Sequence, residues 1–162
     1  MKNNSRIILC GPAAAGKDYL KNKFKERGFK VDVSYTTREK RPNEVDGIDY
    51  NFISREEFLN KINTRHNIPP FYEYVEYDGQ YYATGTREWH TCDVFIMETR
   101  GIEKILPADR AESLIIYINT PFLTRVKRMK ERGWDKDKIT KRLLEDESKF
   151  QHFKNFDIEI SS

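Results

Sequence analysis

The stretch RIILCGPAAAGKDYLKNKFKERG, residues 6–28, decides the fold class of this 162-residue chain. Its first five residues form a continuous apolar run that stops at a Gly-Pro turn, as expected for a short strand buried on both faces. After the turn, Leu20 and Phe24 recur at helical spacing, and Gly28 is placed to end the helix as a C-cap. Residues 11–16 therefore connect a buried strand to a helix, which predicts an α/β fold.

Residues 11–17 read Gly-Pro-Ala-Ala-Ala-Gly-Lys and satisfy the G-x-x-x-x-G-K pattern of a phosphate-binding loop. Small residues let backbone N–H groups approach a phosphate, and a helix that begins near Gly16 adds the positive end of its dipole. Lys17 would then reach the β- and γ-phosphates. The alternative is a Gly-rich turn with a solvated lysine. The strand before the loop and the helix after it make that alternative the weaker one.

Further strands and helices alternate through the second half of the chain. Strand-like runs occupy 93–99, 113–119 and 156–160. Two helical patterns lie between the last two runs, one from Pro121 to Gly133 and one over 135–153. In the second helix we expect one side to carry Ile139, Leu143 and Leu144. This alternation predicts a mostly parallel sheet covered by helices on both faces.

Residues 34–84 differ from the rest of the chain because they are rich in Tyr, Arg, Glu, Gly and Asp. Ser54 with Glu57 three residues later has the form of a helix start. The run FYEYVEYDGQYYATG alternates like strands and is interrupted by Asp78-Gly79, which predicts a hairpin. We therefore expect an inserted subdomain of short strands and turns.

The composition excludes several classes of protein. The net charge of +3, from 29 basic and 26 acidic residues, is too small to indicate a nucleic-acid or membrane partner. No apolar run approaches the roughly 20 residues that span a bilayer, and the N-terminal run is too short for a secretory signal. Cys10 and Cys92 lack metal-ligand spacing, so a reducing cytoplasm is expected. No constellation is formed by His66, His90 and His152.

The run SYTTREKRPNEVDGIDYNFISREEF, residues 34–58, is followed in order by FYEY, GQYY, ETRG, ERG and KRL. These motifs resemble those of guanylate kinases, which carry a similar S-x-T-T-R-x-x-R-x-x-E-x-x-G-x-D-Y-x-F run, and the likeness covers nearly the whole chain. It implies a single domain with the three-layer fold of P-loop nucleoside monophosphate kinases. The implied parts are a core (1–33, 85–124 and 146–162), a monophosphate-binding subdomain (34–84) and a lid (125–145).

The resemblance also implies an activity and its site residues. The chain would be a cytoplasmic, Mg²⁺-dependent ATP:GMP (or dGMP) phosphotransferase, a monomer or weak dimer, with no nucleic-acid or membrane partner. The implied ATP-phosphate site is Gly11, Pro12, Ala13, Ala14, Ala15, Gly16, Lys17 and Asp18, and the implied catalytic cations are Lys17 and the lid arginines Arg128, Arg132 and Arg142. The monophosphate's phosphate would meet Arg38, Arg41, Tyr50 and Tyr82. The guanine base would meet Ser34, Glu73 and Thr84, with Glu98 near the metal and the bound nucleotide.

These roles are chemically reasonable without the resemblance. Two arginines such as Arg38 and Arg41 suit a dianionic phosphate because their planar forks form bidentate bonds. Guanine presents N1–H beside its 2-amino group, and the carboxylate of Glu73 can accept from both. Adenine lacks this pair of donors and would leave the carboxylate unpaired. Each residue alone could be a core aromatic or a solvated charge, so the prediction depends on their joint pattern.

The sequence also departs from the family. Asp18 replaces the usual hydroxyl after the lysine, and its carboxylate could bind Mg²⁺ directly or through water. Residues 96–101 keep only the second acid of the family's acid-x-acid-x-Gln-Gly motif, with Arg100 in place of Gln, and the family's final helix is not expected after the last strand. Asp18 motivates one alternative, a kinase of ribose 1,5-bisphosphate or another small phosphate ester, although Glu73 argues against it. The other alternative, a non-catalytic binding module, is opposed by the intact phosphate loop.

Overall fold

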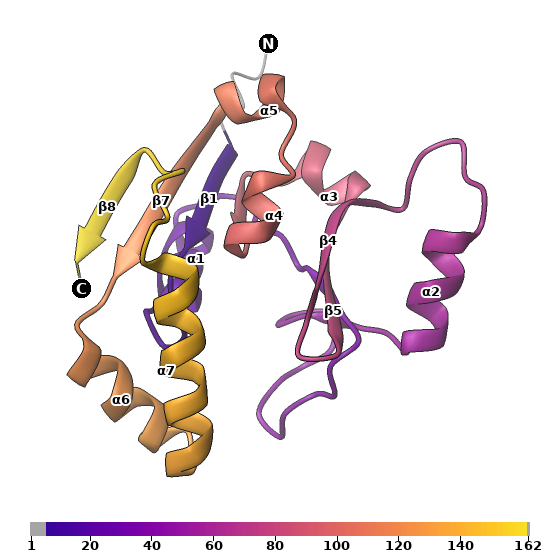
Figure 1. Cartoon of the computed structure of the whole chain (residues 1–162). Coiled ribbons are helices and arrows are strands. Elements are labelled where there is room, and N and C mark those ends of the chain that lie inside the picture. The colour runs from indigo at the N-terminus through magenta and orange to yellow at the C-terminus, as the bar shows by residue number, and fades with distance from the viewer. Residues whose placement is uncertain (1–5, 162) are drawn as a thin grey trace.

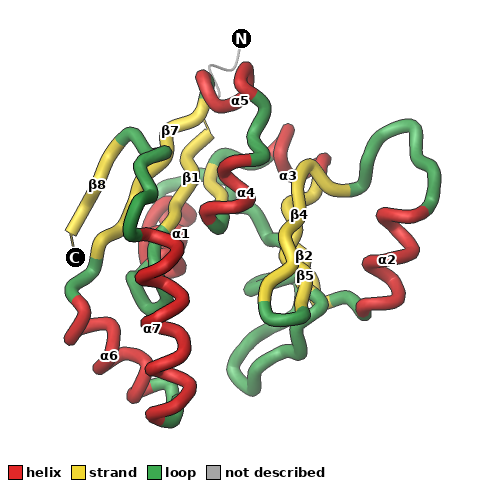
Figure 2. Tube along the Cα trace, in the orientation of Figure 1, coloured by secondary structure: helices red, strands yellow, loops and turns green. Residues whose placement is uncertain are grey.

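The computed structural model describes residues 6–161 (Figure 1). Residues 1–5 and 162, which the sequence assigns to the core, lie outside the described part. In Figure 1 the core sheet occupies one side of the molecule and the segment between β2 and β5 the other, while α7 runs along the core. Figure 2 shows that long loops join the two parts and that strands are present in both.

The core sheet is four-stranded and parallel, in the order β6-β1-β7-β8. Its strands are β1 (Arg6–Cys10), β6 (Val94–Ile96), β7 (Ser113–Asn119) and β8 (Ile158–Ser161). The continuous apolar runs of β1 and β7 are explained by their central positions, where both faces of each strand are covered. The predicted parallel sheet is therefore confirmed.

Helices cover both faces of this sheet. On one face, Leu20 and Phe24 of α1 (Lys17–Glu26) pack against Leu9, Val94 and Ile116. On the other face, a second cluster includes Ile8, Phe95 and Ile115 of the sheet together with Ile102 of α4 (Thr99–Glu103). Phe150, the last residue of α7 (Lys136–Phe150), stacks on Tyr117 with ring centroids 5.4 Å apart. The arrangement is the predicted three-layer α/β fold.

A second, mixed sheet is formed within residues 35–85, in the order β3-β2-β5-β4. Its strands are β2 (Tyr35–Thr36), β3 (Asn51–Phe52), β4 (Phe71–Tyr77) and β5 (Gln80–Gly85). Asp78 and Gly79 have φ of 49° and 75°, as a two-residue hairpin turn of this twist requires, so the predicted hairpin is confirmed. The Ser54 hydroxyl accepts from Glu57 N at 3.0 Å, which confirms the predicted start of α2 (Arg55–Asn63).

Several predicted bounds need correction. Residues 93–99 contain only the three-residue β6, because Glu98 is already the N-cap of α4. The last strand begins at 158 rather than 156, because Asp157 instead pairs with Arg110 at 3.0 Å. The sequence did not indicate α3 (Thr86–Thr91), α4 or α5 (Pro107–Ala111), which are too short to show a helical period.

The helical pair α6 (Phe122–Glu131) and α7 confirms the two helices expected after Pro121, but one side of α7 was assigned wrongly. Ile139 and Leu143 pack against Met129, whereas Leu144 is 63% exposed. The inward side of α7 instead includes Asp146, which is 2% exposed. Within residues 6–161, no helix is long and apolar enough to cross a bilayer.

Candidate functional site

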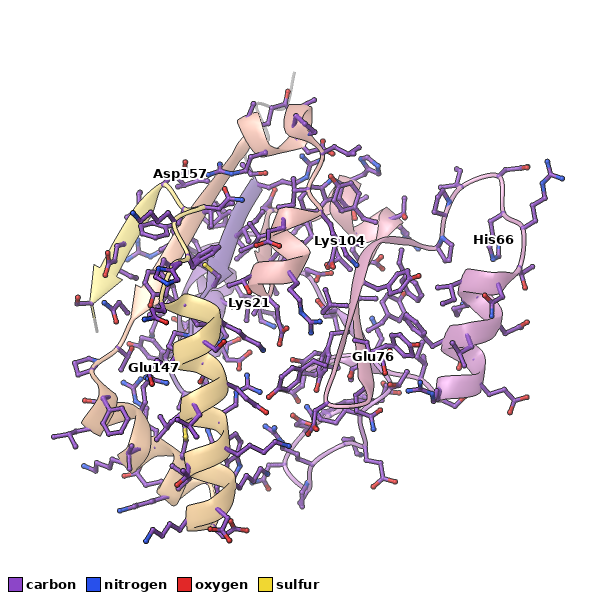
Figure 3. The ribbon with its side chains drawn as sticks, viewed as in Figure 1. Lys21, His66, Glu76, Lys104, Glu147 and Asp157 are labelled. Carbon is purple, nitrogen blue, oxygen red and sulfur yellow. The ribbon has the colours of Figure 1, made fainter. Side chains whose placement is uncertain are left out.

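A cavity of about 640 Å³ lies between the core sheet, the second sheet and the α6–α7 pair. The ends of β1 and β6, the phosphate loop, β4–β5 and α7 all contribute to its wall. Every candidate site residue from the sequence except Pro12 lines it: Gly11, Ala13, Ala14, Ala15, Gly16, Lys17, Asp18, Ser34, Arg38, Arg41, Tyr50, Glu73, Tyr82, Thr84, Glu98, Arg128, Arg132 and Arg142. In contrast, His66 lies at the outer end of α2, away from the core (Figure 3).

The phosphate loop has the backbone that its sequence requires. Gly16, the N-cap of α1, has φ of +104°, a conformation that residues with a Cβ atom rarely adopt. Lys17 Nζ donates to the carbonyl oxygens of Gly11 (2.5 Å) and Pro12 (3.1 Å), so its charge is held against the loop. Burial, followed by the nearby Arg142 charge, lowers the pKa of Lys17 to about 8. The loop thus concentrates N–H groups and a desolvated lysine at one end of the cavity.

Arg128 and Arg142, two of the arginines that the sequence assigns to a lid, lie beside this loop. Arg128 Nη1 donates to Ala14 O at 2.9 Å. Arg142 Nε lies 3.3 Å from Oδ1 of Asp146, and Asp146 Oδ2 accepts from Ala13 N at 3.0 Å. Burial alone would lower the pKa of Arg142, but the Asp146 charge raises it above its usual value. A buried carboxylate on α7 therefore connects the lid arginine to the phosphate loop.

Asp146 was missed in the sequence because an acidic residue on a polar helix normally faces solvent. It also pairs with Arg125 of α6, at 3.4 Å. Arg132 is the C-cap of α6, and burial followed by the charge of Arg41 lowers its pKa. Arg125 and Arg142 thus share one buried carboxylate, and Arg132 is influenced by the charge of Arg41.

A second group of cations and aromatic rings comes from the segment between β2 and β3. Arg38 forms a two-pronged pair with Glu44, at 3.0 and 2.8 Å, and its guanidinium lies 5.4 Å from the Tyr50 ring centroid. Tyr50 packs edge-on to Tyr82 at 6.3 Å. The Arg41 guanidinium lies 5.7 Å from the ring centroid of Trp134. Glu44 is the glutamate of the quoted R-x-x-R-x-x-E run, and that motif was the signal that could have indicated its pairing role.

Three polar residues form one row across the second sheet. Tyr35 pairs with Ala83, so the preceding Ser34 lies opposite Thr84, and Thr84 pairs with Glu73 on β4. The Thr84 hydroxyl donates to Glu73 Oε1 at 2.8 Å. Glu73 Oε2 is buried and has no hydrogen-bond partner in the described part of the chain. Burial raises the pKa of Glu73 to about 7 against the opposing Thr84 bond.

The α4 helix closes the cavity behind Glu73. A Cβ placed on Gly101 would lie 2.9 Å from Glu73 Oε2, so a larger residue at this position would displace the carboxylate. Arg100 donates to Glu76 O and Lys104 to Tyr74 O, which attaches α4 to β4. Figure 3 shows Lys104 on the side of α4 that faces β4. The departure at Arg100 from the family's motif therefore has a structural role here.

Two further carboxylates border the cavity between the loop and the row. Glu98 lies 3.6 Å from Lys149 of α7, a cation that the sequence reasoning did not include. Asp18, whose side chain is 80% exposed, lies 3.9 Å from Lys21. Across the described residues there is no group of three or more His, Cys, Asp or Glu side chains placed to hold a metal ion. One exposed carboxylate beside a phosphate site is nevertheless a common arrangement for Mg²⁺, which takes its other ligands from water and substrate phosphates.

Comparison with known proteins decides the family. The family model described as "Guanylate kinase" matches residues 3–162. The chain belongs to the guanylate kinase family. Among its curated relatives, the guanylate kinase of Vibrio parahaemolyticus is 34% identical over 176 residues, covering 99% of this chain and 81% of the relative. That of Bartonella henselae is 31% identical over 175 residues, covering 98% of this chain and 76% of the relative.

A solved structure supports the fold of this guanylate kinase family member independently. The crystal structure of guanylate kinase from Anaplasma phagocytophilum matches with a TM-score of 0.72 and 22% identity, over 98% of this chain and 77% of that one. At this identity the likeness concerns the fold alone. The relatives carry the names of kinases of one class, so neither the sugar-phosphate kinase nor the binding module considered above is favoured.

Proposed function

We propose that this member of the guanylate kinase family transfers the γ-phosphoryl group of ATP to GMP or dGMP, giving ADP and GDP or dGDP. The observation that carries the proposal is the row Ser34–Thr84–Glu73, with a buried unpaired carboxylate oxygen, in one cavity with the arginine pair and the phosphate loop. A carboxylate oxygen without a partner costs about 1–3 kcal/mol unless a ligand donates to it. Guanine's adjacent N1–H and 2-amino groups are such donors.

The chemistry requires positioning and positive charge rather than a proton acceptor on the protein. Arg38, Arg41, Tyr50 and Tyr82 would hold the acceptor phosphate. For this, Arg38 would exchange part of its pair with Glu44 for phosphate oxygens. Lys17, Arg128, Arg132 and Arg142 would surround the transferred group and neutralise its charge. Closing the lid over them would exclude water and so prevent ATP hydrolysis.

Mg²⁺ would be held by Asp18 together with ATP oxygens, and Glu98 is close enough to the cavity to orient water around it. When bound, the ion would supply positive charge that neutralises the ATP phosphates. The protein's own part is to keep a single carboxylate at the N-terminus of α1, beside the N–H groups of the loop.

The test is a steady-state assay of the full chain with ATP, Mg²⁺ and GMP, dGMP, AMP, UMP, CMP or dTMP. Selective turnover of GMP and dGMP is expected. Lys17→Ala should abolish turnover and leave the circular dichroism spectrum unchanged. Glu73→Gln should weaken GMP binding by tenfold or more, because one of the two accepting oxygens is replaced by an NH₂ group that can only donate. Preference for a base other than guanine would contradict the assignment.

A further inference from the structure

The base end of the cavity holds a second buried carboxylate, that of Asp32. It lines the cavity, is 2% exposed, and lies where the chain passes from the core sheet to the second sheet. Its backbone N–H donates to Val94 O at 2.8 Å, which anchors it beside β6. Its Oδ2 accepts from the Ser34 hydroxyl at 2.6 Å, whereas its buried Oδ1 has no hydrogen-bond partner among residues 6–161.

This carboxylate changes what Ser34 can offer a ligand. A serine hydroxyl has one proton, and here Asp32 accepts it in a short charge-assisted bond. Thr84 gives its own proton to Glu73 Oε1 in the same way. Toward a base, the two hydroxyls therefore present only lone pairs. The two carboxylates present one oxygen each without a partner, Asp32 Oδ1 and Glu73 Oε2. Two such buried atoms on different elements call for a ligand with two separate N–H donors.

Guanine meets only part of this demand. Its N1–H and 2-amino group suit Glu73, but its O6 is an acceptor and would face the lone pairs of Ser34. To donate to O6, Ser34 must give up its bond to Asp32, which leaves both oxygens of that carboxylate unpaired. A purine with amino groups at both C2 and C6 presents donors on both sides of N1 instead. Such a base would let Ser34 keep its present bond.

Resting on the proposed function, we propose that Asp32 is a specificity-determining residue that admits 2,6-diaminopurine nucleoside monophosphates as substrates. Asp32, with Ser34, accepts from the 6-amino group, and Glu73 accepts from the 2-amino group. N1 of this base is an acceptor. The pKa of Glu73, raised chiefly by burial to about 7, lets that carboxyl carry the proton that N1 requires. Adenine lacks the 2-amino group, so it offers Glu73 no N–H donor.

The first test uses the unmodified full chain and three monophosphates, those of 2,6-diaminopurine, 2-aminopurine and guanine. Dissociation constants are measured by calorimetry without ATP, and kcat/KM with ATP and Mg²⁺. The 2-aminopurine nucleotide lacks only the 6-amino group. The diaminopurine nucleotide should bind more tightly than it, and have a higher kcat/KM, by about tenfold or more. Equal values for the two would overturn the inference even if GMP is an excellent substrate. Failure to phosphorylate GMP would instead overturn the proposed function, and the binding comparison would still stand.

The second test compares Asp32→Asn with Asp93→Asn. Asp93 precedes β6 and accepts from Lys30 N at 2.8 Å but does not line the cavity, so it controls for the same chemical change nearby. Asp32→Asn should lower the ratio of diaminopurine-nucleotide affinity to GMP affinity about tenfold, because the amide can donate to O6 but is a weaker acceptor for the 6-amino group. Asp93→Asn should alter neither. A proportional loss for both nucleotides in Asp32→Asn, or an unchanged ratio, would overturn the role of Asp32.

Discussion

At the scale of single residues, the cavity contains ionisable side chains whose charged forms are disfavoured by burial. Glu73 is the clearest case, because burial outweighs its hydrogen bond from Thr84 and the opposing charge of Lys104, and the charges of Asp32 and Glu98 add to the shift. The ligand-free protein thus keeps a carboxyl that is half protonated near neutral pH. Its ionised form would be restored by N–H donors from guanine, so substrate binding and proton release are coupled at this atom.

We therefore expect GMP affinity to depend on pH through Glu73. Below pH 7 the bound form must release a proton, so affinity should rise up to tenfold per pH unit and level off above 7. The sign for folding is opposite. A pKa raised from 4.5 to about 7 gives stability that is complete below pH 4.5 and lost as pH rises to 7. Calorimetric titration of GMP from pH 5.5 to 8.5 measures the first effect.

Glu73→Gln is the control for that titration, because GMP's own phosphate also titrates near pH 6. The variant should keep only the part of the pH dependence that belongs to the phosphate. An identical profile in both proteins would show that Glu73 does not exchange its proton on binding.

Asp18 gives a second prediction at this scale. Because it is the exposed carboxylate beside the phosphate loop, Asp18→Ser should raise the Mg²⁺ concentration that gives half-maximal activity several-fold, since a charged ligand is replaced by a hydroxyl. Activity is titrated with Mg²⁺ at fixed ATP. Asp137→Ser on α7, also exposed and acidic, should leave the titration unchanged. An unaltered Mg²⁺ dependence in Asp18→Ser would remove Asp18 from the metal site.

At the scale of elements, the buried side chain of Asp146 joins α7 to the phosphate loop. Asp146 accepts from Ala13 N and pairs with Arg125 and Arg142, so three partners depend on a carboxylate that is 2% exposed. Removing one partner of a buried pair leaves the other charge uncompensated. The helix is thereby held against the phosphate loop.

We expect Asp146→Asn to lower the free energy of unfolding by about 3 kcal/mol, measured by urea titration. Glu147→Gln, the next residue on α7 and exposed to solvent, should stay within about 0.5 kcal/mol of the unmodified protein. Equal effects of the two substitutions would contradict the role assigned to Asp146.

Much of this architecture could be predicted at the level of elements. The apolar runs of β1 and β7, the Ser54 cap of α2 and the helical patterns of α6 and α7 are all local signals. The phosphate-loop motif likewise predicts the strand before it and the helix after it. Asp146 and Leu144 could not be assigned, because they lie two positions apart and only tertiary contacts decide which of them faces inward. The role of Asp32 could not be predicted from the sequence for a similar reason. Its importance comes from the register that places Ser34 opposite Thr84, which no local pattern encodes.

At the scale of the whole molecule, the second-sheet segment and the α6–α7 pair are in contact across the cavity. Tyr77 donates to Glu145, Asp78 pairs with Lys141 at 3.3 Å, and the Arg41 guanidinium lies over Trp134. These contacts join the β4–β5 hairpin and the arginine-bearing loop to the α6–α7 pair. A motion that separated these parts to admit or release nucleotides would therefore change the surroundings of Trp134.

The chain has two tryptophans, and their different settings make this motion measurable. Trp89 is fully buried in the core, while Trp134 is partly exposed between Arg41 and Lys138, whose Nζ lies 4.3 Å from its ring centroid. When a phosphate draws Arg41 away, the indole loses a cation from its face, and its emission should change on addition of GMP together with a non-hydrolysable ATP analogue. Trp89→Phe should keep that change and Trp134→Phe should abolish it. A nucleotide-dependent signal that survives in Trp134→Phe would have to come from Trp89. It would mean that the rearrangement reaches the core and is not confined to the contacts across the cavity.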